Sequence, residues 1–184
     1  LMTILIVAVL AAVISLLWSI FGAAPLEVGR DRYFMESRQA LSPAATVTSV
    51  FRTPYMNVVK VQFLRNLKIV VGTLLLVVPG IYWSFCYVLV PYLLAENPYL
   101  STTRAMQLSK DIMDGEKFHY FVLALSFIGW DMLCSLTLGI GFFFLEPYKQ
   151  ATEAEFYAAM RSKALAQGLT TTEELGGFVR HESY

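Results

Sequence analysis

Long apolar runs separated by short polar segments dominate the sequence. The run at 1–21 contains no charged residue, and a helix of that length reaches about 30 Å, the thickness of a bilayer's hydrocarbon core. Further apolar runs cover 69–78, 81–95 and 118–138. Pro25 is expected to end the first helix, because proline lacks a backbone donor and clashes with the preceding turn. The pattern predicts an all-α protein with several membrane helices.

The Pro79-Gly80 pair leaves two topologies open for the second apolar region. In one, residues 69–94 form a single kinked span. In the other, residues 57–78 and 81–95 are two helices joined by a tight turn, since proline fixes φ and glycine accepts positive φ.

A weak internal repeat and the placement of basic residues favour the hairpin. Residues 76–92 and 136–148 each contain a Gly-Ile step followed by Pro-Tyr, which indicates a second hairpin. With hairpins at 57–95 and 118–160, the two turns hold no Lys or Arg. The polar connections hold ten: Arg30, Arg32, Arg38, Arg52, Arg104, Lys110, Lys117, Arg161, Lys163 and Arg180. The positive-inside rule then predicts that these connections and the C-terminus are cytoplasmic.

The polar segments contain further predicted helices. Residues 26–56 begin as a helix that continues into, or lies along, the headgroup layer, and they end in a loop. Ser101 is expected to cap an amphipathic helix at 101–113, whose apolar face lies on the membrane interface or packs against the protein itself. Residues 151–166 form a helix with charges on one side.

The chain is expected to form one membrane domain at 1–166, an α-helical bundle of one N-terminal span, two hairpins and the interfacial helix between them. Residues 167–184 are expected to be a mobile cytoplasmic tail. Within this tail, Thr171 and Glu174 are suited to cap one helical turn.

Composition agrees with a membrane location and excludes several function classes. Hydrophobic residues make up 57% and charged residues 15% of the 184 residues, against about 45–50% and 25% in soluble domains. These values argue against disorder, a coiled coil and an ordinary soluble enzyme. Because 14 Lys and Arg balance 14 Asp and Glu, the sequence offers no polycationic surface for nucleic acid.

No sequence motif indicates a cofactor, a metal or a catalytic centre. Cys86 and Cys134 lie inside apolar runs without zinc-site spacing and are interpreted as small buried residues. Metalloprotease, hydrolase and phosphate-loop signatures are absent from the sequence. We therefore expect a protein that is not an enzyme and holds no cofactor.

Asp131 is the first candidate for a functional residue, because it lies in the middle of an apolar run. An acid at that depth suggests a proton relay, an ion site or an anchor for a polar ligand. The structural alternative is a hydrogen bond between helices or an ion pair with Lys68 or Arg65.

A second candidate is a charged rim at the cytoplasmic mouth of the bundle, which could bind an anionic lipid headgroup. Its members lie near helix ends or near membrane depth: Glu27, Arg30, Arg65, Lys68, Glu96, Glu146 and Lys149. Charges at such depth are costly, so we expect short hairpins. Solvated interfacial charges and helix-end pairs are the alternative interpretation of the same residues.

Several motifs, taken in order along residues 1–164, resemble the DUF975 family. They are Pro25-Leu26-Glu27-Val28-Gly29, Val78-Pro79-Gly80-Ile81, Val90-Pro91-Tyr92-Leu93-Leu94-Ala95-Glu96-Asn97-Pro98, Leu125-Ser126-Phe127-Ile128-Gly129-Trp130, Leu136-Thr137-Leu138-Gly139-Ile140-Gly141 and Pro147-Tyr148-Lys149-Gln150-Ala151-Thr152. The resemblance implies a bacterial integral membrane protein of the plasma membrane, distantly similar to the membrane domain that accompanies some glycerophosphodiester phosphodiesterases. It also implies one more apolar helix before Leu1, and it supplies no catalytic residues.

Two functions follow from these patterns as hypotheses. The first is a non-enzymatic accessory or scaffold protein that binds membrane lipid, a membrane-protein partner or a second copy of itself through the charged rim. The alternative is a small transporter or pore component that uses Asp131 as its intramembrane polar site.

Overall fold

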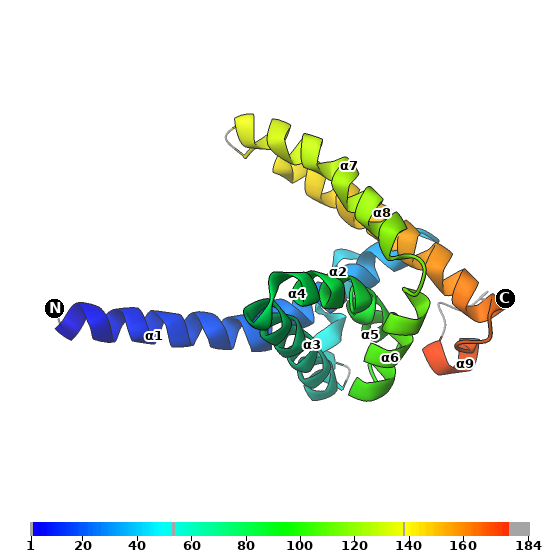
Figure 1. Ribbon diagram of the computed structural model, residues 1–184, viewed down its shortest axis with the longest axis horizontal. Coiled ribbons are helices and arrows are strands. Elements are labelled where there is room, and N and C mark those ends of the chain that lie inside the picture. The colour runs from blue at the N-terminus through cyan, green and yellow to red at the C-terminus, as the bar shows by residue number, and fades with distance from the viewer. Residues whose placement is uncertain (1, 53, 138, 177–184) are drawn as a thin grey trace.

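The computed structural model describes residues 2–52, 54–137 and 139–176, and in these residues the protein is all-helical, as expected. Figure 1 shows the elements in order along the chain. They are α1 (Met2–Trp18), the π-helix η1 (Ser19–Ala23), α2 (Ala24–Ser37), the 3-10 helix η2 (Ala44–Arg52), α3 (Tyr55–Leu75), α4 (Val77–Cys86), α5 (Val90–Glu96), α6 (Thr102–Ile112), α7 (Lys117–Leu136), α8 (Phe142–Ala166) and α9 (Thr172–Leu175).

The first helix does not end at Pro25, contrary to the sequence prediction. α1, η1 and α2 follow one another without a break, and Pro25 lies in the first turn of α2. Proline cannot donate to the carbonyl of Phe21, four residues earlier. The hydroxyl of Tyr55 donates to that carbonyl instead, so a residue from α3 satisfies the acceptor that Pro25 leaves open.

Within the described part of the chain, three segments are long and apolar enough to cross a membrane: Leu5–Ser37, Val77–Glu96 and Lys117–Leu136. The described residues do not form the closed bundle that the sequence predicted. The large apolar side chains of α1 are 48–77% exposed, and α1 and the α7–α8 pair project from the rest of the chain in different directions (Figure 1). The apolar helices are therefore separate arms whose surfaces are suited to contact lipid.

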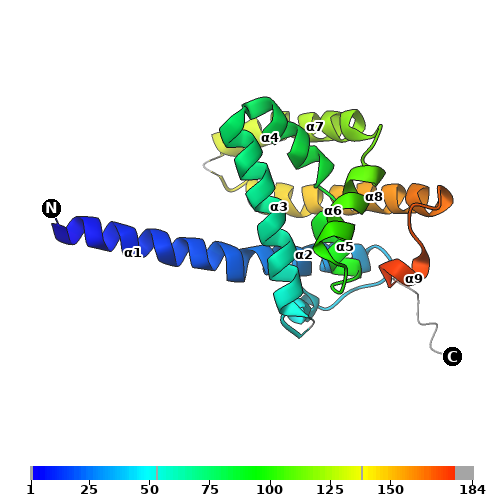
Figure 2. The same cartoon turned by 60° about the horizontal axis from the view of Figure 1, so that its bottom comes forward.

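Two helical hairpins occur in the described residues, and the turn of the first lies earlier than predicted. Leu76, with φ −159° and ψ 138°, is the residue between α3 and α4, and these helices lie side by side (Figure 2). Pro79 falls in the first turn of α4, where a missing backbone donor disrupts no helical hydrogen bond. The second reversal, between α7 and α8, contains Gly139 at φ +85°.

The buried core lies at the end of the molecule where the arms meet. α5 is at its centre, with all six residues 90–95 buried, and α2, α3 and α6 pack around it. Ser101 caps α6 as predicted, since its hydroxyl accepts from the amide of Arg104. The apolar face of α6 is buried against α3, α5 and α8, so it packs on the protein and not on the membrane interface.

The segment after α8 folds back onto the core. Thr171 caps α9 as expected, accepting from the amide of Glu174. Leu175 is 1% exposed, and the side chain of Asn97 donates to the carbonyl of Glu174 at 2.6 Å. Residues 167–176 of the expected mobile tail are therefore packed against the domain, and 177–184 lie outside the described residues.

Candidate functional site

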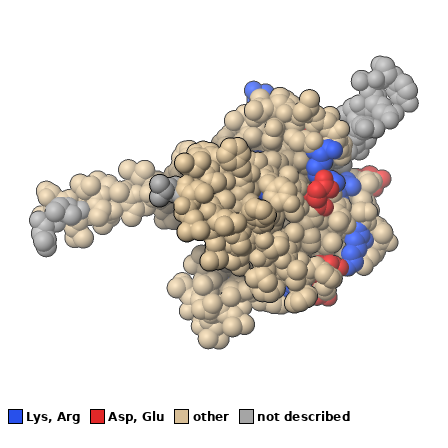
Figure 3. Space-filling view, turned by 90° about the horizontal axis from the view of Figure 1, so that it is seen from above, with Lys and Arg blue, Asp and Glu red and all other residues tan. Residues whose placement is uncertain are grey.

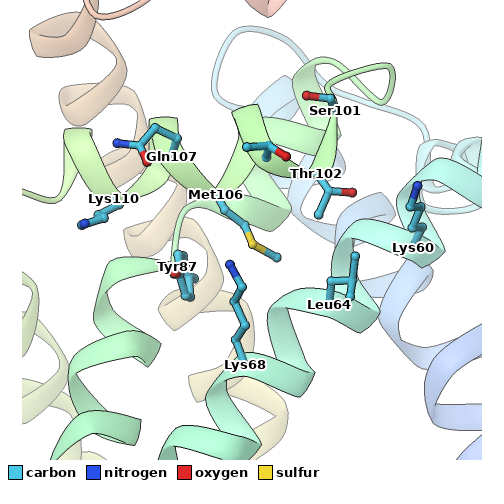
Figure 4. A pocket seen from close by; sticks show the side chains of 10 residues that line it. Lys60, Leu64, Lys68, Tyr87, Ser101, Thr102, Met106, Gln107 and Lys110 are labelled. Carbon is cyan, nitrogen blue, oxygen red and sulfur yellow. The ribbon is translucent and has the colours of Figure 1, made fainter.

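A groove of about 570 Å³ opens between α3 and α6 (Figure 4). It is lined by Lys60, Leu64, Lys68, Tyr87, Ser101, Thr102, Thr103, Met106, Gln107 and Lys110. Three of these residues are lysines and none is a carboxylate. We call this cavity the lysine groove.

The two helices supply its basic side chains from opposite walls. Lys60 and Lys68 are eight residues apart on α3, about 12 Å along the helix, and Figure 4 shows both extending toward α6, which carries Lys110. The ammonium group of Lys68 lies 5.6 Å from the centre of the Tyr87 ring, a cation–π contact that holds this side chain beside the groove. The groove is therefore electrostatically suited to an anion.

Among the described residues, the groove lysines belong to a small set of cations without an ion-pair partner. Most Lys and Arg side chains in the described residues pair with a carboxylate. The described cations outside these pairs are Lys60, Lys68, Lys110 and Arg52, and three of the four line the groove. The protein neutralises its charges elsewhere and leaves a local positive excess here.

The remaining lining combines hydroxyl groups with an apolar wall. Ser101, Thr102 and Thr103 stand at the first turn of α6, where the helix dipole also favours negative charge. Leu64 and the buried Met106 supply apolar surface. Such a lining suits an amphiphile with a polar anionic end, such as a phospholipid headgroup with its glycerol and first methylene groups.

The predicted charged rim does not form one ring. Lys68 belongs to the groove, whereas Arg65 points elsewhere: its Nε donates to the carbonyl of Tyr87 at 3.1 Å, and its Nη1 lies 3.5 Å from a carboxylate oxygen of Glu27. The Glu27–Arg65 pair joins α2 to α3. The predicted rim residues are separated because the helices that carry them bury different faces in the core, so their charged side chains point in different directions.

Arg30 belongs to a partly buried polar cluster, with Asp31 and Glu153, that the sequence analysis did not predict. Its guanidinium lies 3.3 Å from a carboxylate oxygen of Asp31, which is 2% exposed. Nearby on α8, Glu153 accepts from the hydroxyl of Tyr92 at 3.2 Å, and burial raises the pKa of its carboxyl. The run of charges at 27–32 was the available signal, but it did not show which side chain points inward.

The other predicted residues take part in ion pairs or face outward. Glu96 accepts from Nε of Arg161 at 2.6 Å and from the hydroxyl of Tyr157, and Glu146 is exposed on α8.

Asp131 pairs with Lys149 of α8 at 3.2 Å, which corrects the predicted partners Lys68 and Arg65. Because residues 131 and 149 lie at matching heights in the α7–α8 hairpin, this pair links its two helices.

The described residues contain no group of three or more His, Cys, Asp or Glu that could hold a metal ion. Cys86 and Cys134 are free thiols, both buried, in agreement with their interpretation as small core residues.

Comparison with known proteins gives one result. A model of the family described as Protein of unknown function (DUF975) matches residues 1–164. No curated protein and no solved structure matches the chain. The further likeness to the membrane domain of glycerophosphodiester phosphodiesterases stays a prediction.

Proposed function

Because the chain belongs to the DUF975 family, whose function is not established, we propose its function from the geometry: it is a non-enzymatic membrane protein that binds the anionic headgroup of a phospholipid in the lysine groove. In this proposal the protein lies in the bacterial plasma membrane with its core on the cytoplasmic side. Its role is that of an accessory or scaffold protein, and the bound lipid is its principal partner.

The observation that carries the proposal is that Lys60, Lys68 and Lys110 line one cavity whose lining contains no carboxylate. The position of the groove supports a lipid as the source of the anion. It opens beside α3, whose outer end and the following α4 expose apolar side chains. On the face in Figure 3, most visible charged side chains lie at the end away from α1, which separates a charged half from apolar arms.

The experiment measures lipid retention by native mass spectrometry, using full-length protein in nanodiscs of phosphatidylcholine with a small fraction of phosphatidylglycerol. Each groove lysine is expected to contribute about 1 kcal/mol. The triple variant Lys60→Gln, Lys68→Gln, Lys110→Gln should therefore bind phosphatidylglycerol about 100-fold more weakly, whereas three Lys→Arg changes should retain most binding.

The matched control compares single changes of equal charge. Lys110→Gln should weaken retention of phosphatidylglycerol about fivefold, and Arg52→Gln, which removes an unpaired cation outside the groove, should leave it unchanged. Equal loss in both single variants would show a non-specific surface effect, and unchanged retention in the triple variant would refute the groove as the site.

The transporter hypothesis has less support. Its polar residue, Asp131, is engaged by Lys149, an arrangement that explains an acid at that depth as a link between α7 and α8.

A further inference from the structure

We infer that the α3–α4 hairpin inserts into one leaflet of the bilayer as a wedge and does not cross the membrane. The partner of this surface is the acyl-chain layer of the leaflet beside the core. The inference rests on the length, surface and backbone of the hairpin, and it is independent of whether a lipid headgroup occupies the lysine groove.

The hairpin is too short to span a bilayer. Residues 77–96 are long and apolar enough to cross, but their second half is α5, whose residues 90–95 are buried inside the core. Lipid can therefore surround only α4, ten residues and about 15 Å long. On α3, the distance from Lys68 to the end of the helix at Leu75 is about 10 Å. Both values fit one leaflet, which is half of the roughly 30 Å hydrocarbon core.

The surface of the hairpin's outer end is apolar on the described residues of both helices. Its large side chains are 42–81% exposed: Val70, Val71, Leu74, Leu75, Leu76, Val77, Val78 and Ile81. A patch of this kind at the end of two helices would be unfavourable in water. Acyl chains cover it without any other protein.

Part of the turn's backbone is hydrogen-bonded within the hairpin, which lowers the cost of placing it in lipid. The amide of Leu76 donates to the carbonyl of Gly72 at 3.1 Å, and its carbonyl accepts from the amide of Gly80 at 3.4 Å. The hydroxyl of Thr73 donates to the carbonyl of Ile69 at 2.9 Å. Pro79 brings no backbone donor that would need a partner at the start of α4. These bonds pair both backbone polar groups of Leu76, the one non-helical residue between α3 and α4.

Two glycines let the helices of the hairpin approach closely. A Cβ atom on Gly80 would lie 2.2 Å from the hydroxyl oxygen and 2.7 Å from Cα of Thr73, and one on Gly72 would lie 2.5 Å from the Trp83 ring. Small residues at such contacts are typical of helix pairs packed in lipid. The close contact gives a wedge that enters the leaflet as one unit.

Cationic and aromatic side chains mark the base of the wedge. Lys68 lies over the ring of Tyr87, and Lys117 lies 5.3 Å from the centre of the Tyr82 ring. Tyrosine and lysine favour the headgroup region, where a ring meets the acyl boundary and an ammonium group meets phosphate. The Lys68–Tyr87 pair, at the end of α4, marks the depth at which the hairpin stops, and the Lys117–Tyr82 pair lies nearer its middle.

The test uses single cysteines in the full-length protein, after Cys86→Ala and Cys134→Ala have removed the native thiols. Leu75→Cys and Val78→Cys report on the tip, where the side chains are exposed and substitution disturbs no packing. Lys60→Cys reports on the base. Thr3→Cys, far along α1, is the control for a segment that crosses. Each is treated with a membrane-impermeant maleimide in intact cells and in inside-out vesicles.

The tip cysteines are expected to be protected from both sides, Lys60→Cys to be labelled from one side, and Thr3→Cys to be labelled from the other. A spin label at Leu75→Cys should collide with oxygen far more often than with a water-soluble nickel complex, as expected near the bilayer centre. Labelling of the tip from the side opposite Lys60→Cys would show that the hairpin crosses. Labelling from the same side would place it in water, and either result overturns the inference.

Discussion

Replacing Leu175 by alanine is expected to detach α9 from the core while the rest of the fold stays intact. α9 is held by the buried Leu175 side chain, by the ion pair between Arg104 and Glu174 and by the bond from Asn97 to the backbone of Glu174. A four-residue helix has little stability of its own. Its position therefore depends on these few contacts, and the largest apolar one can be removed singly.

The magnitude follows from burial. Leu175→Ala removes about three carbon groups from an environment that is 1% exposed, each worth about 0.8 kcal/mol, or about 2.4 kcal/mol in total. The ion pair is partly exposed, with 38% and 27% of its two side chains accessible, so it contributes about 0.5 kcal/mol. Loss of the leucine contact should raise the detached population about 50-fold.

Hydrogen exchange measures this population at the amides of Leu175 and Gly176, which donate to the carbonyls of Thr171 and Thr172. Their exchange should quicken about 50-fold in Leu175→Ala, while α5 amides keep their rates. Glu173→Ala is the control, because it changes an exposed residue of the same helix. Equal exchange in the two variants would refute the argument that the buried leucine holds α9.

Three further outcomes are expected. The guanidinium of Arg104 holds the pKa of the Glu174 carboxyl below its ordinary 4.5. This pair therefore stabilises docked α9 above pH 4.5, and its contribution is lost as the pH falls below that value. A fluorophore near α9 should report the release of the helix at low pH, and Glu174→Gln should abolish the pH dependence of that release. Asp131→Leu should destabilise the protein by about 0.5–1 kcal/mol in detergent melting because it breaks the partly exposed pair with Lys149, and the same change in a Lys149→Leu background should cost less. Ser109→Ala should cost about 1–3 kcal/mol in the same assay, because the buried hydroxyl donates to the carbonyl of Cys86 at the end of α4 at 2.8 Å. No loss would show that this bond contributes little.

Local features were predictable from the sequence, and contacts between distant segments were not. The caps at Ser101 and Thr171 and the helix predicted at 151–166, which in the structure already begins at Phe142, follow from residues within a turn or two of one another. The continuation of the first helix through Pro25 depends on Tyr55, thirty residues away. No local pattern shows such a partner.

The candidate site illustrates the same limit. Lys68 was identified because it lies near membrane depth, but Lys60 and Lys110 lie among ordinary polar segments. They become notable only when α3 and α6 bring them to one cavity. The sequence indicated which charged residues would lie near membrane depth, and the fold showed which described lysines have no carboxylate partner.

The separation of the arms has a consequence for the choice of membrane. A helix packed in a bundle has its tilt set by its neighbours, whereas α1, whose sides are exposed, can tilt until its apolar length matches the surrounding bilayer. From Met2 to Ala23 that length is about 33 Å, close to an average hydrocarbon thickness. In the proposed membrane location, bilayers that are thinner or thicker by a few ångströms would change the inclination of this arm without repacking α5 and its neighbours, and the core would stay the same in membranes of different composition.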